Sequence, residues 1–209
     1  MQVVVVTADD LKEELLFQGL GEGLNVRWTN DINNLPPQAD ACIDLLFEDD
    51  RQSHSNILSR LRHKLVVIND VAETAENLPE HFIRINGWPT FLRRAIVEAS
   101  CRNEGFRRNA ETLFSFFNKK IEWLPDISGF ITARVISMII NEAYFSMADN
   151  VSTKEEIDIA MKLGTNYPYG PFEWSKLIGT KRIYGLLDLL SKQETRYKPC
   201  ISLLNERND

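Results

Sequence analysis

A group of arginines between residues 93 and 108 contains the side chains of this sequence best suited to bind an anion. A guanidinium is a planar fork that binds phosphate through two hydrogen bonds, so the group indicates a possible phosphate-binding patch. Glu104 and Glu111 lie in the same stretch, which leaves a solvated, charge-balanced face as the alternative. The candidates for ligand binding are Arg93, Arg94, Arg107 and Arg108, with Arg102 between them.

Histidines and carboxylates are the other groups that could carry chemistry. Of the three histidines, we interpret His54 and His63 as surface residues of a polar helix, and we place His81 at the start of a strand. Neighbouring acids at positions 9–10 and 48–50 could form a carboxylate pair or a metal site, but such pairs are typical of solvated loops. The three cysteines are widely separated and lack a CxxC spacing, so we expect no metal site.

The elements that would position these side chains change in character near residue 125. Before it, short apolar runs alternate with helical segments, a pattern that favours an open α/β sheet. We expect strands near residues 3–6, 24–28, 41–47, 64–69, 81–86, 95–100 and 121–124, and helices after residue 9 and over 53–62 and 105–119. Residues 1–125 are therefore predicted to form one α/β domain.

The segment from residue 126 to residue 209 has helical patterns instead. Residues 129–147 are apolar on most sides, which predicts a buried central helix, and charges within the run disfavour a membrane span. Ser152 with Glu155 is a capping-box pattern, and Gly164 could end that helix. Gly170-Pro171 then predicts the start of a third helix, which Gly179 would end.

The same segment carries an ordered series of motifs. They are GFITAR, a helix that ends in NEA, STKEEIDIAMKLG and YPYGPFEWSKLIG, followed by the tail YKPCISLL. This series resembles the C-terminal domain of the 3-hydroxyacyl-CoA dehydrogenases. Fainter similarity extends upstream through ADACIDLLFED and FIRINGWPTFLRRAIVEAS. The resemblance implies a trimmed Rossmann-like, mostly parallel sheet domain at 1–125 and a helical domain at 126–209 that forms homodimers.

The resemblance also implies where catalytic residues would lie. Enzymes of this family use a His-Glu pair as the base, with an asparagine and a serine in contact with the substrate. Alignment with FIRINGWPTFLRRAIVEAS places Asn86 at the histidine position and Glu98 at the glutamate position. Ala133 takes the place of the asparagine, and the serine position falls near Asn69 and Asp70. An amide has no useful pKa, so Asn86 cannot act as the base.

A dinucleotide-binding fold needs a glycine-rich turn after its first strand. Here that turn is Thr7-Ala8-Asp9-Asp10, which has no glycine and places two carboxylates where phosphates would bind. Asp31 near the end of the second strand could imitate a ribose-binding acid. From these departures we expect a domain without bound cofactor, although the family uses NAD.

Composition limits the remaining possibilities. The net charge of -6 disfavours nucleic acid as a partner, and no signal peptide or membrane span is evident, so we expect a cytoplasmic protein. Three hypotheses remain open. The first is a catalytically silent 3-hydroxyacyl-CoA dehydrogenase relative that binds acyl-CoA or a protein partner. The others are an active NAD-dependent 3-hydroxyacyl-CoA or 3-hydroxybutyryl-CoA dehydrogenase with unusual catalytic residues, and a pure dimerisation module.

Overall fold

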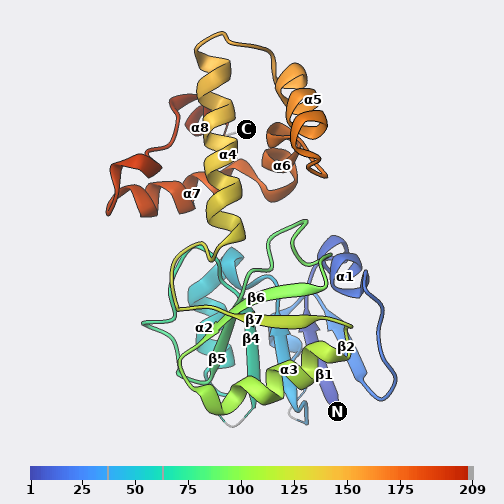
Figure 1. Cartoon of the computed structure of the whole chain (residues 1–209). Coiled ribbons are helices and arrows are strands. Elements are labelled where there is room, and N and C mark those ends of the chain that lie inside the picture. Colours follow the sequence, from blue (N-terminus) through green and yellow to red (C-terminus); the bar gives the residue numbers. More distant parts are fainter. Residues whose placement is uncertain (37, 63, 207–209) are drawn as a thin grey trace. The chain divides into compact units, whose positions relative to one another are not determined.

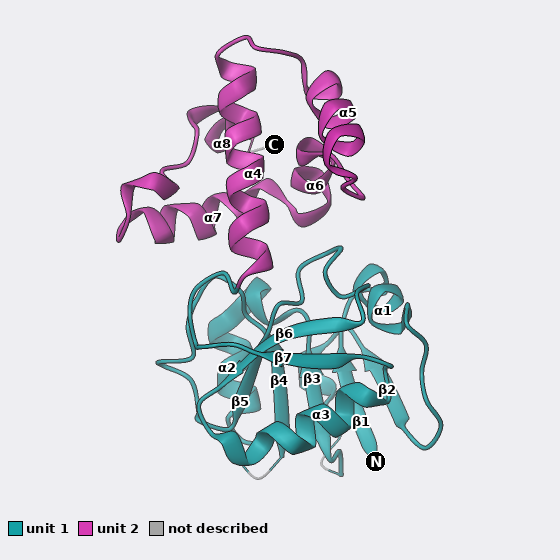
Figure 2. Ribbon diagram, in the orientation of Figure 1, with its two compact units in different colours: residues 1–130 teal, residues 131–209 magenta. Residues whose placement is uncertain are grey.

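The computed structural model describes residues 1–36, 38–62 and 64–206. The chain divides into two compact units, a sheet unit of residues 1–130 and a helical unit of residues 131–209 (Figure 2). The sequence predicted both architectures. The two units are described separately below.

A seven-stranded sheet forms the centre of the sheet unit (Figure 1). Its order is β2-β1-β3-β4-β5-β6-β7, and all neighbours are parallel except the antiparallel pair β5 and β6. The strands are β1 (Gln2–Val6), β2 (Asn25–Thr29), β3 (Ala41–Asp44), β4 (Leu65–Asn69), β5 (Phe82–Ile85), β6 (Ile96–Cys101) and β7 (Lys120–Trp123). The continuous apolar runs of β1, β3 and β4 are buried on both faces, as a parallel sheet requires.

Each face of the sheet has its own apolar layer. Helices α1 (Asp9–Leu16) and α3 (Arg107–Ser115) cover one face through Leu15 and Phe114. Helix α2 (Arg51–Leu58) and the 3-10 turn η1 (Ile32–Asn34) cover the other through Leu58 and Ile32. Among the described residues between β2 and β3, η1 is the one helical turn, so this part of the face is covered by less than a full helix.

The helical unit is built around α4 (Thr132–Ala148), whose buried positions include Ile136, Ile140 and Tyr144. Four helices surround it: α5 (Lys154–Thr165), α6 (Pro171–Ile178), α7 (Thr180–Ser191) and α8 (Ile201–Glu206). Within the described ranges, no helix combines the length and the apolar composition needed to cross a bilayer.

The ends of α5 differ from those predicted. Thr153, rather than Ser152, is the N-cap, and its hydroxyl accepts a hydrogen bond from the Glu156 amide at 3.3 Å. The helix continues past Gly164 and ends at Asn166, which has a left-handed φ of 57°. Asparagine tolerates that conformation because its short side chain can hydrogen-bond locally.

Asp158 of α5 fixes the conformation of the Gly-Pro-Phe-Glu segment at residues 170–173. Its carboxylate accepts hydrogen bonds from the backbone amides of Phe172 at 2.8 Å and Glu173 at 3.1 Å, so it caps the start of α6. A Cβ at Gly170 would lie 2.3 Å from that carboxylate, so only glycine fits there. The motif is thus a helix-to-helix junction, and its aromatic residues pack around Trp174.

The boundary between the units lies after residue 130, whereas we expected it after residue 125. The reason is Arg84 of β5, which is fully buried. Its guanidinium forms an ion pair with Asp126 and lies 4.8 Å from the ring centroid of Phe130. These contacts tie the segment after β7 back to the sheet.

Candidate functional site

Asn86 and Glu98 lie side by side at the carboxyl end of β5. The antiparallel register, which pairs Ile85 with Ala99, also places Asn86 opposite Glu98. The Asn86 Nδ2 atom donates a hydrogen bond of 2.9 Å to Glu98 Oε2, and both side chains are buried. The two positions that the resemblance implied for a catalytic pair therefore meet in space.

The amide of Asn86 has a second, unused hydrogen-bonding atom. Because Nδ2 faces a carboxylate, Oδ1 is the remaining acceptor, and it is buried without a hydrogen-bond partner among the described residues. An amide oxygen can accept a hydrogen bond from a hydroxyl group, but it is too weakly basic to remove the hydroxyl proton. The Asn86 amide can therefore orient a hydroxyl group but cannot act as its base.

The residues around Asn86 are locked by buried hydrogen bonds. Asn69 at the end of β4 donates to the Leu45 carbonyl and accepts from the Gly87 amide at 3.0 Å, so the suggested serine position holds a structural residue. A Cβ at Gly87 would lie 2.9 Å from the Asn69 side chain. The Trp88 indole donates to Glu48 Oε2 at 2.7 Å, and the Trp88 side chain is fully buried.

The loop after Trp88 is strained. Thr90 has a φ of 76°, a conformation that β-branched residues rarely adopt. Both carboxylate oxygens of Glu14 in α1 accept hydrogen bonds from the Thr90 amide, at 2.7 and 2.9 Å. Lys119 donates to the carbonyl oxygens of Leu92 and Arg94 on the same loop. This buried network fixes the path of the chain between Asn86 and Glu98.

A cavity of about 430 Å³ lies at the carboxyl ends of β1 and β2. In open α/β sheets this edge, next to the point where the strand order reverses, is where nucleotides bind. The lining includes Thr7, Asp9 and Lys12 from the turn and helix after β1, and Trp28 from β2. The Lys12 ammonium lies 5.1 Å from the centroid of the Trp28 ring.

The lining fits a nucleotide in part. Lys12 offers a cation, Trp28 an aromatic face and Thr29 a hydroxyl, whereas Asp9 presents a carboxylate where a pyrophosphate would approach. Asp31 does not belong to this lining. Its carboxylate instead accepts hydrogen bonds from Asn33 and Asn34. The bonds from Asn33 lower the pKa of Asp31, and the one from the Asn33 backbone amide caps η1.

The expected arginine patch is not formed. Arg93 and Arg94 precede β6, whereas Arg107 and Arg108 follow it, so the two pairs lie at opposite ends of a six-residue strand. That strand is roughly 20 Å long at about 3.4 Å per residue. Arg93 lies over the ring of Phe17 at 4.3 Å. The four side chains therefore cannot all bind the same phosphate group.

One pair of titratable groups was missed from the sequence. Nδ1 of His54 lies 2.6 Å from Oδ2 of the buried Asp44, so His54 is not the surface residue that we predicted. The contact with Asp44 raises the pKa of His54. The two residues come from a strand and a helix ten positions apart, and no short motif marks such a pair. His63 lies outside the described residues.

Comparisons with known proteins agree with this architecture. The profile of the "3-hydroxyacyl-CoA dehydrogenase, C-terminal domain" matches residues 129–207. A 3-hydroxybutyryl-CoA dehydrogenase of Clostridioides difficile is 29% identical over 90% of this chain and 64% of its own length. The 3-hydroxyadipyl-CoA dehydrogenase of Escherichia coli (strain K12) is 38% identical over 54% of this chain and 24% of its own.

A crystal structure of (S)-3-hydroxybutyryl-CoA dehydrogenase from Ralstonia eutropha superposes with a TM-score of 0.74, covering 98% of this chain and 92% of that one at 17% identity. Residues 129–207 therefore resemble the C-terminal domain of 3-hydroxyacyl-CoA dehydrogenases, and the whole chain shares the fold of these enzymes. The chain spans less than two-thirds of the length of the curated dehydrogenases named above.

The similarity to dehydrogenases corrects one expectation. We expected no cofactor because the turn after β1 lacks glycine, but the proteins that match this chain are dehydrogenases of a family that uses NAD. The error came from treating the glycine-rich turn as the whole site. The structure keeps a cavity at the ends of β1 and β2 that does not depend on glycine.

Ala133 is the position where the resemblance would place an asparagine. It stands in the first turn of α4 and is fully buried. A methyl group forms no hydrogen bond, so Ala133 cannot make the polar contact that an asparagine side chain would make.

The buried lysine beneath the Thr90 loop predicts a pH effect on stability. Burial lowers the pKa of Lys119 from 10.5 to about 8, so between these values the unfolded chain binds more protons than the folded one. The free energy of unfolding is therefore expected to rise as the pH increases from about 8 toward 10.5. Urea denaturation of the wild type and of Lys119→Met across this range measures the difference. If both proteins show the same pH dependence, the assignment is wrong.

Proposed function

We propose that this chain is a 3-hydroxyacyl-CoA dehydrogenase relative that binds a hydroxyacyl thioester without oxidising it. The observation that carries the proposal is the buried hydrogen bond from Asn86 to Glu98. A family enzyme needs a base that takes the hydroxyl proton while hydride leaves the substrate. An amide has no pKa near neutrality, so it cannot take up this proton.

The ligand proposed for this site is a 3-hydroxyacyl-CoA. The free Oδ1 of Asn86 is a hydrogen-bond acceptor that suits a hydroxyl donor, and Glu98 fixes its orientation. Because Asn86 is only 1% exposed, binding requires the side chains that cover it to move. A 3-keto thioester has no donor at this carbon and would gain less from the same contact.

The cofactor proposed for the chain is NAD, in the cavity at the ends of β1 and β2. Nicotinamide, when bound, supplies a hydride acceptor. Lys12 and Trp28 are the side chains proposed to hold the nucleotide, one through charge and the other through its aromatic face. Asp9 opposes the pyrophosphate, so we expect weaker binding than a glycine-rich turn would give.

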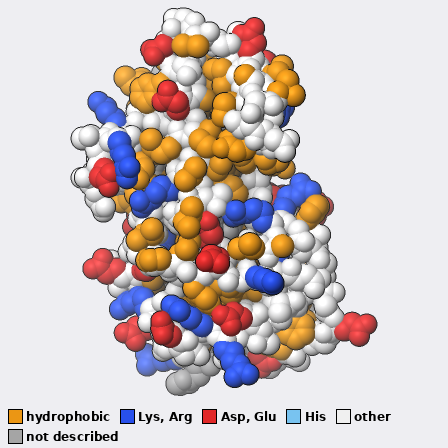
Figure 3. Space-filling model, in the orientation of Figure 1, with side chains coloured by type: hydrophobic (Ala, Val, Ile, Leu, Met, Phe, Trp, Pro, Cys, Tyr) orange, Lys and Arg blue, Asp and Glu red, His pale blue; other side chains and the backbone are white. Residues whose placement is uncertain are grey.

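We also propose that the helical unit forms a homodimer. Its surface carries many large apolar side chains, and Figure 3 shows such residues gathered over this part of the chain. Ile159 and Leu163 lie one turn apart on α5, and Leu163 is 83% exposed. The exposed set is Ile131, Val135, Phe145, Val151, Ile159, Leu163, Leu177 and Ile201.

We expect this protein to bind the substrate and the cofactor without catalysing the reaction between them. Isothermal titration is expected to detect 3-hydroxybutyryl-CoA and NADH, while NADH oxidation in the presence of acetoacetyl-CoA stays at the blank rate. Asn86→His alone should leave turnover undetectable, because Ala133 and the turn after β1 still differ from the family pattern. Oxidation of NADH by the wild type above the blank would refute the silent assignment.

Removal of the Asn86 amide should affect one ligand more than the other. Asn86→Ala is expected to weaken 3-hydroxybutyryl-CoA binding about tenfold, the factor that one hydrogen bond of about 1.4 kcal/mol represents. Acetoacetyl-CoA, which lacks the hydroxyl, serves as the matched control and should lose much less. Equal losses for both ligands, measured by titration, would mean that Asn86 does not contact the hydroxyl.

The dimer proposal predicts a change in mass. Ile159→Glu with Leu163→Glu places two charges in the proposed interface and should convert a dimer to a monomer in light scattering coupled to size exclusion. Ile96→Glu, at a half-exposed position of the sheet unit, is the control and should leave the mass unchanged. A wild-type monomer at micromolar concentration would contradict the proposal.

A further inference from the structure

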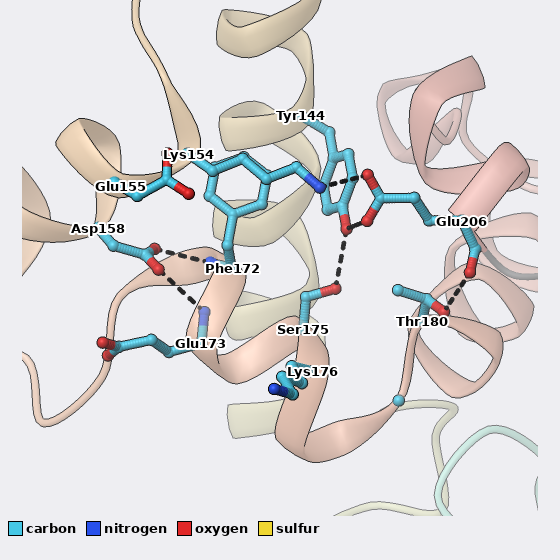
Figure 4. Close-up of a pocket in the computed structure, with 11 residues that line it drawn as sticks. Tyr144, Lys154, Glu155, Asp158, Phe172, Glu173, Ser175, Lys176, Thr180 and Glu206 are labelled. Carbon is cyan, nitrogen blue, oxygen red and sulfur yellow. Dashed lines mark hydrogen bonds and ion pairs between the residues drawn. The ribbon is translucent and has the colours of Figure 1, made fainter. Parts of the chain in front are cut away.

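The helical unit contains a cavity of about 500 Å³ that lies between α4, α5, α6 and α8 (Figure 4). It is distinct from the Asn86 site, because all of its lining belongs to residues 144–206. The volume is in the range of small-molecule sites, which are typically about 300–1,000 Å³.

A carboxylate of the chain itself occupies one end of this cavity. Glu206 of α8 points into it and contacts Lys154 Nζ at 2.5 Å through Oε1 (Figure 4). The Tyr144 hydroxyl donates to Oε2 of the same carboxylate at 2.7 Å. The Ser175 hydroxyl lies 3.3 Å from the Tyr144 oxygen and extends the chain of hydroxyl groups.

The groups that bind this carboxylate are held by elements other than α8. Tyr144 lies in α4, is 1% exposed, and packs its ring 4.9 Å from that of Phe172. The Lys154 ammonium, from the first turn of α5, lies 5.4 Å from the Phe172 ring. These contacts hold a cation and a hydroxyl donor on the same wall of the cavity.

The carboxylate comes from α8, of which the structure describes Ile201–Glu206. This helix is also anchored by the buried side chain of Leu203 and by a hydrogen bond from Thr180 to the Glu206 carbonyl. Tyr144 and Lys154 thus bind a carboxylate that belongs to a different element, and another carboxylate could occupy the same position.

We propose that Tyr144, Lys154 and Ser175 form a binding site for a small aliphatic monocarboxylate, and that Glu206 fills this site in the absence of such a ligand. The ammonium and the phenol bind the carboxylate, because charge-assisted hydrogen bonds are the strongest available to it. The Phe172 and Tyr144 rings offer an apolar wall for the alkyl chain. This assignment is independent of the Asn86 site.

The test is rescue of Glu206→Ala by added carboxylates. This variant should melt at a lower temperature than the wild type, and sodium butyrate should restore the melting temperature with saturation, while sodium chloride of equal ionic strength should not. Lys154→Met in the same background should weaken the butyrate effect at least tenfold. Glu206→Asp, which withdraws the carboxylate by one methylene, replaces Glu206→Ala if the latter does not fold.

Glu155→Ala is the matched control, since Glu155 lines the same cavity without contacting the Tyr144 hydroxyl (Figure 4). Butyrate should leave its melting temperature unchanged relative to chloride. Equal stabilisation of the control and the Glu206 variant, or stabilisation that Lys154→Met does not reduce, would overturn the proposal. Absence of any carboxylate-specific shift in the Glu206 variants would do the same.

Discussion

The buried guanidinium of Arg84 holds the carboxyl end of the sheet together. It donates to the carbonyl oxygens of Asp70 and Val71 and forms an ion pair with Asp126, so it joins three separate segments. A buried charge is costly unless it is paired and hydrogen-bonded, and here two carbonyl groups and a carboxylate supply those partners. Arg84 lies in β5 two residues before Asn86, which directly follows the strand, so the frame that Arg84 fixes also places the amide.

Within this frame, backbone pairing brings Asn86 against Glu98. The antiparallel pairing of β5 and β6 places residue 86 opposite Glu98, because register depends on the backbone and not on the side chain. The Asn86 amide donates a hydrogen bond to the Glu98 carboxylate, but an amide has no pKa near neutrality. The sheet thus sets the position, and the side chain at that position sets the chemistry.

The two cavities differ in how their polar groups are satisfied. At the ends of β1 and β2, Lys12 and Asp9 face the same space with opposite charges, and the adjacent strands supply a ring and a hydroxyl. In the helical unit, the cation and the phenol converge on one carboxylate from the chain itself. The first arrangement suits a polar ligand of mixed charge, whereas the second is selective for an anion.

The sequence by itself determined the two architectures, because continuous apolar runs and helix-start signals act over a few residues. It also showed the resemblance to 3-hydroxyacyl-CoA dehydrogenases that the match over residues 129–207 supports. It could not determine that Arg93 and Arg107 lie at opposite ends of β6, that His54 meets Asp44, or that Glu206 reaches Tyr144. The absence of glycine from the turn after β1 also does not exclude NAD, which the similarity to dehydrogenases supports. Those features depend on which side chains the fold brings together from distant parts of the chain. Local sequence patterns contain no information on the spatial distances between such residues.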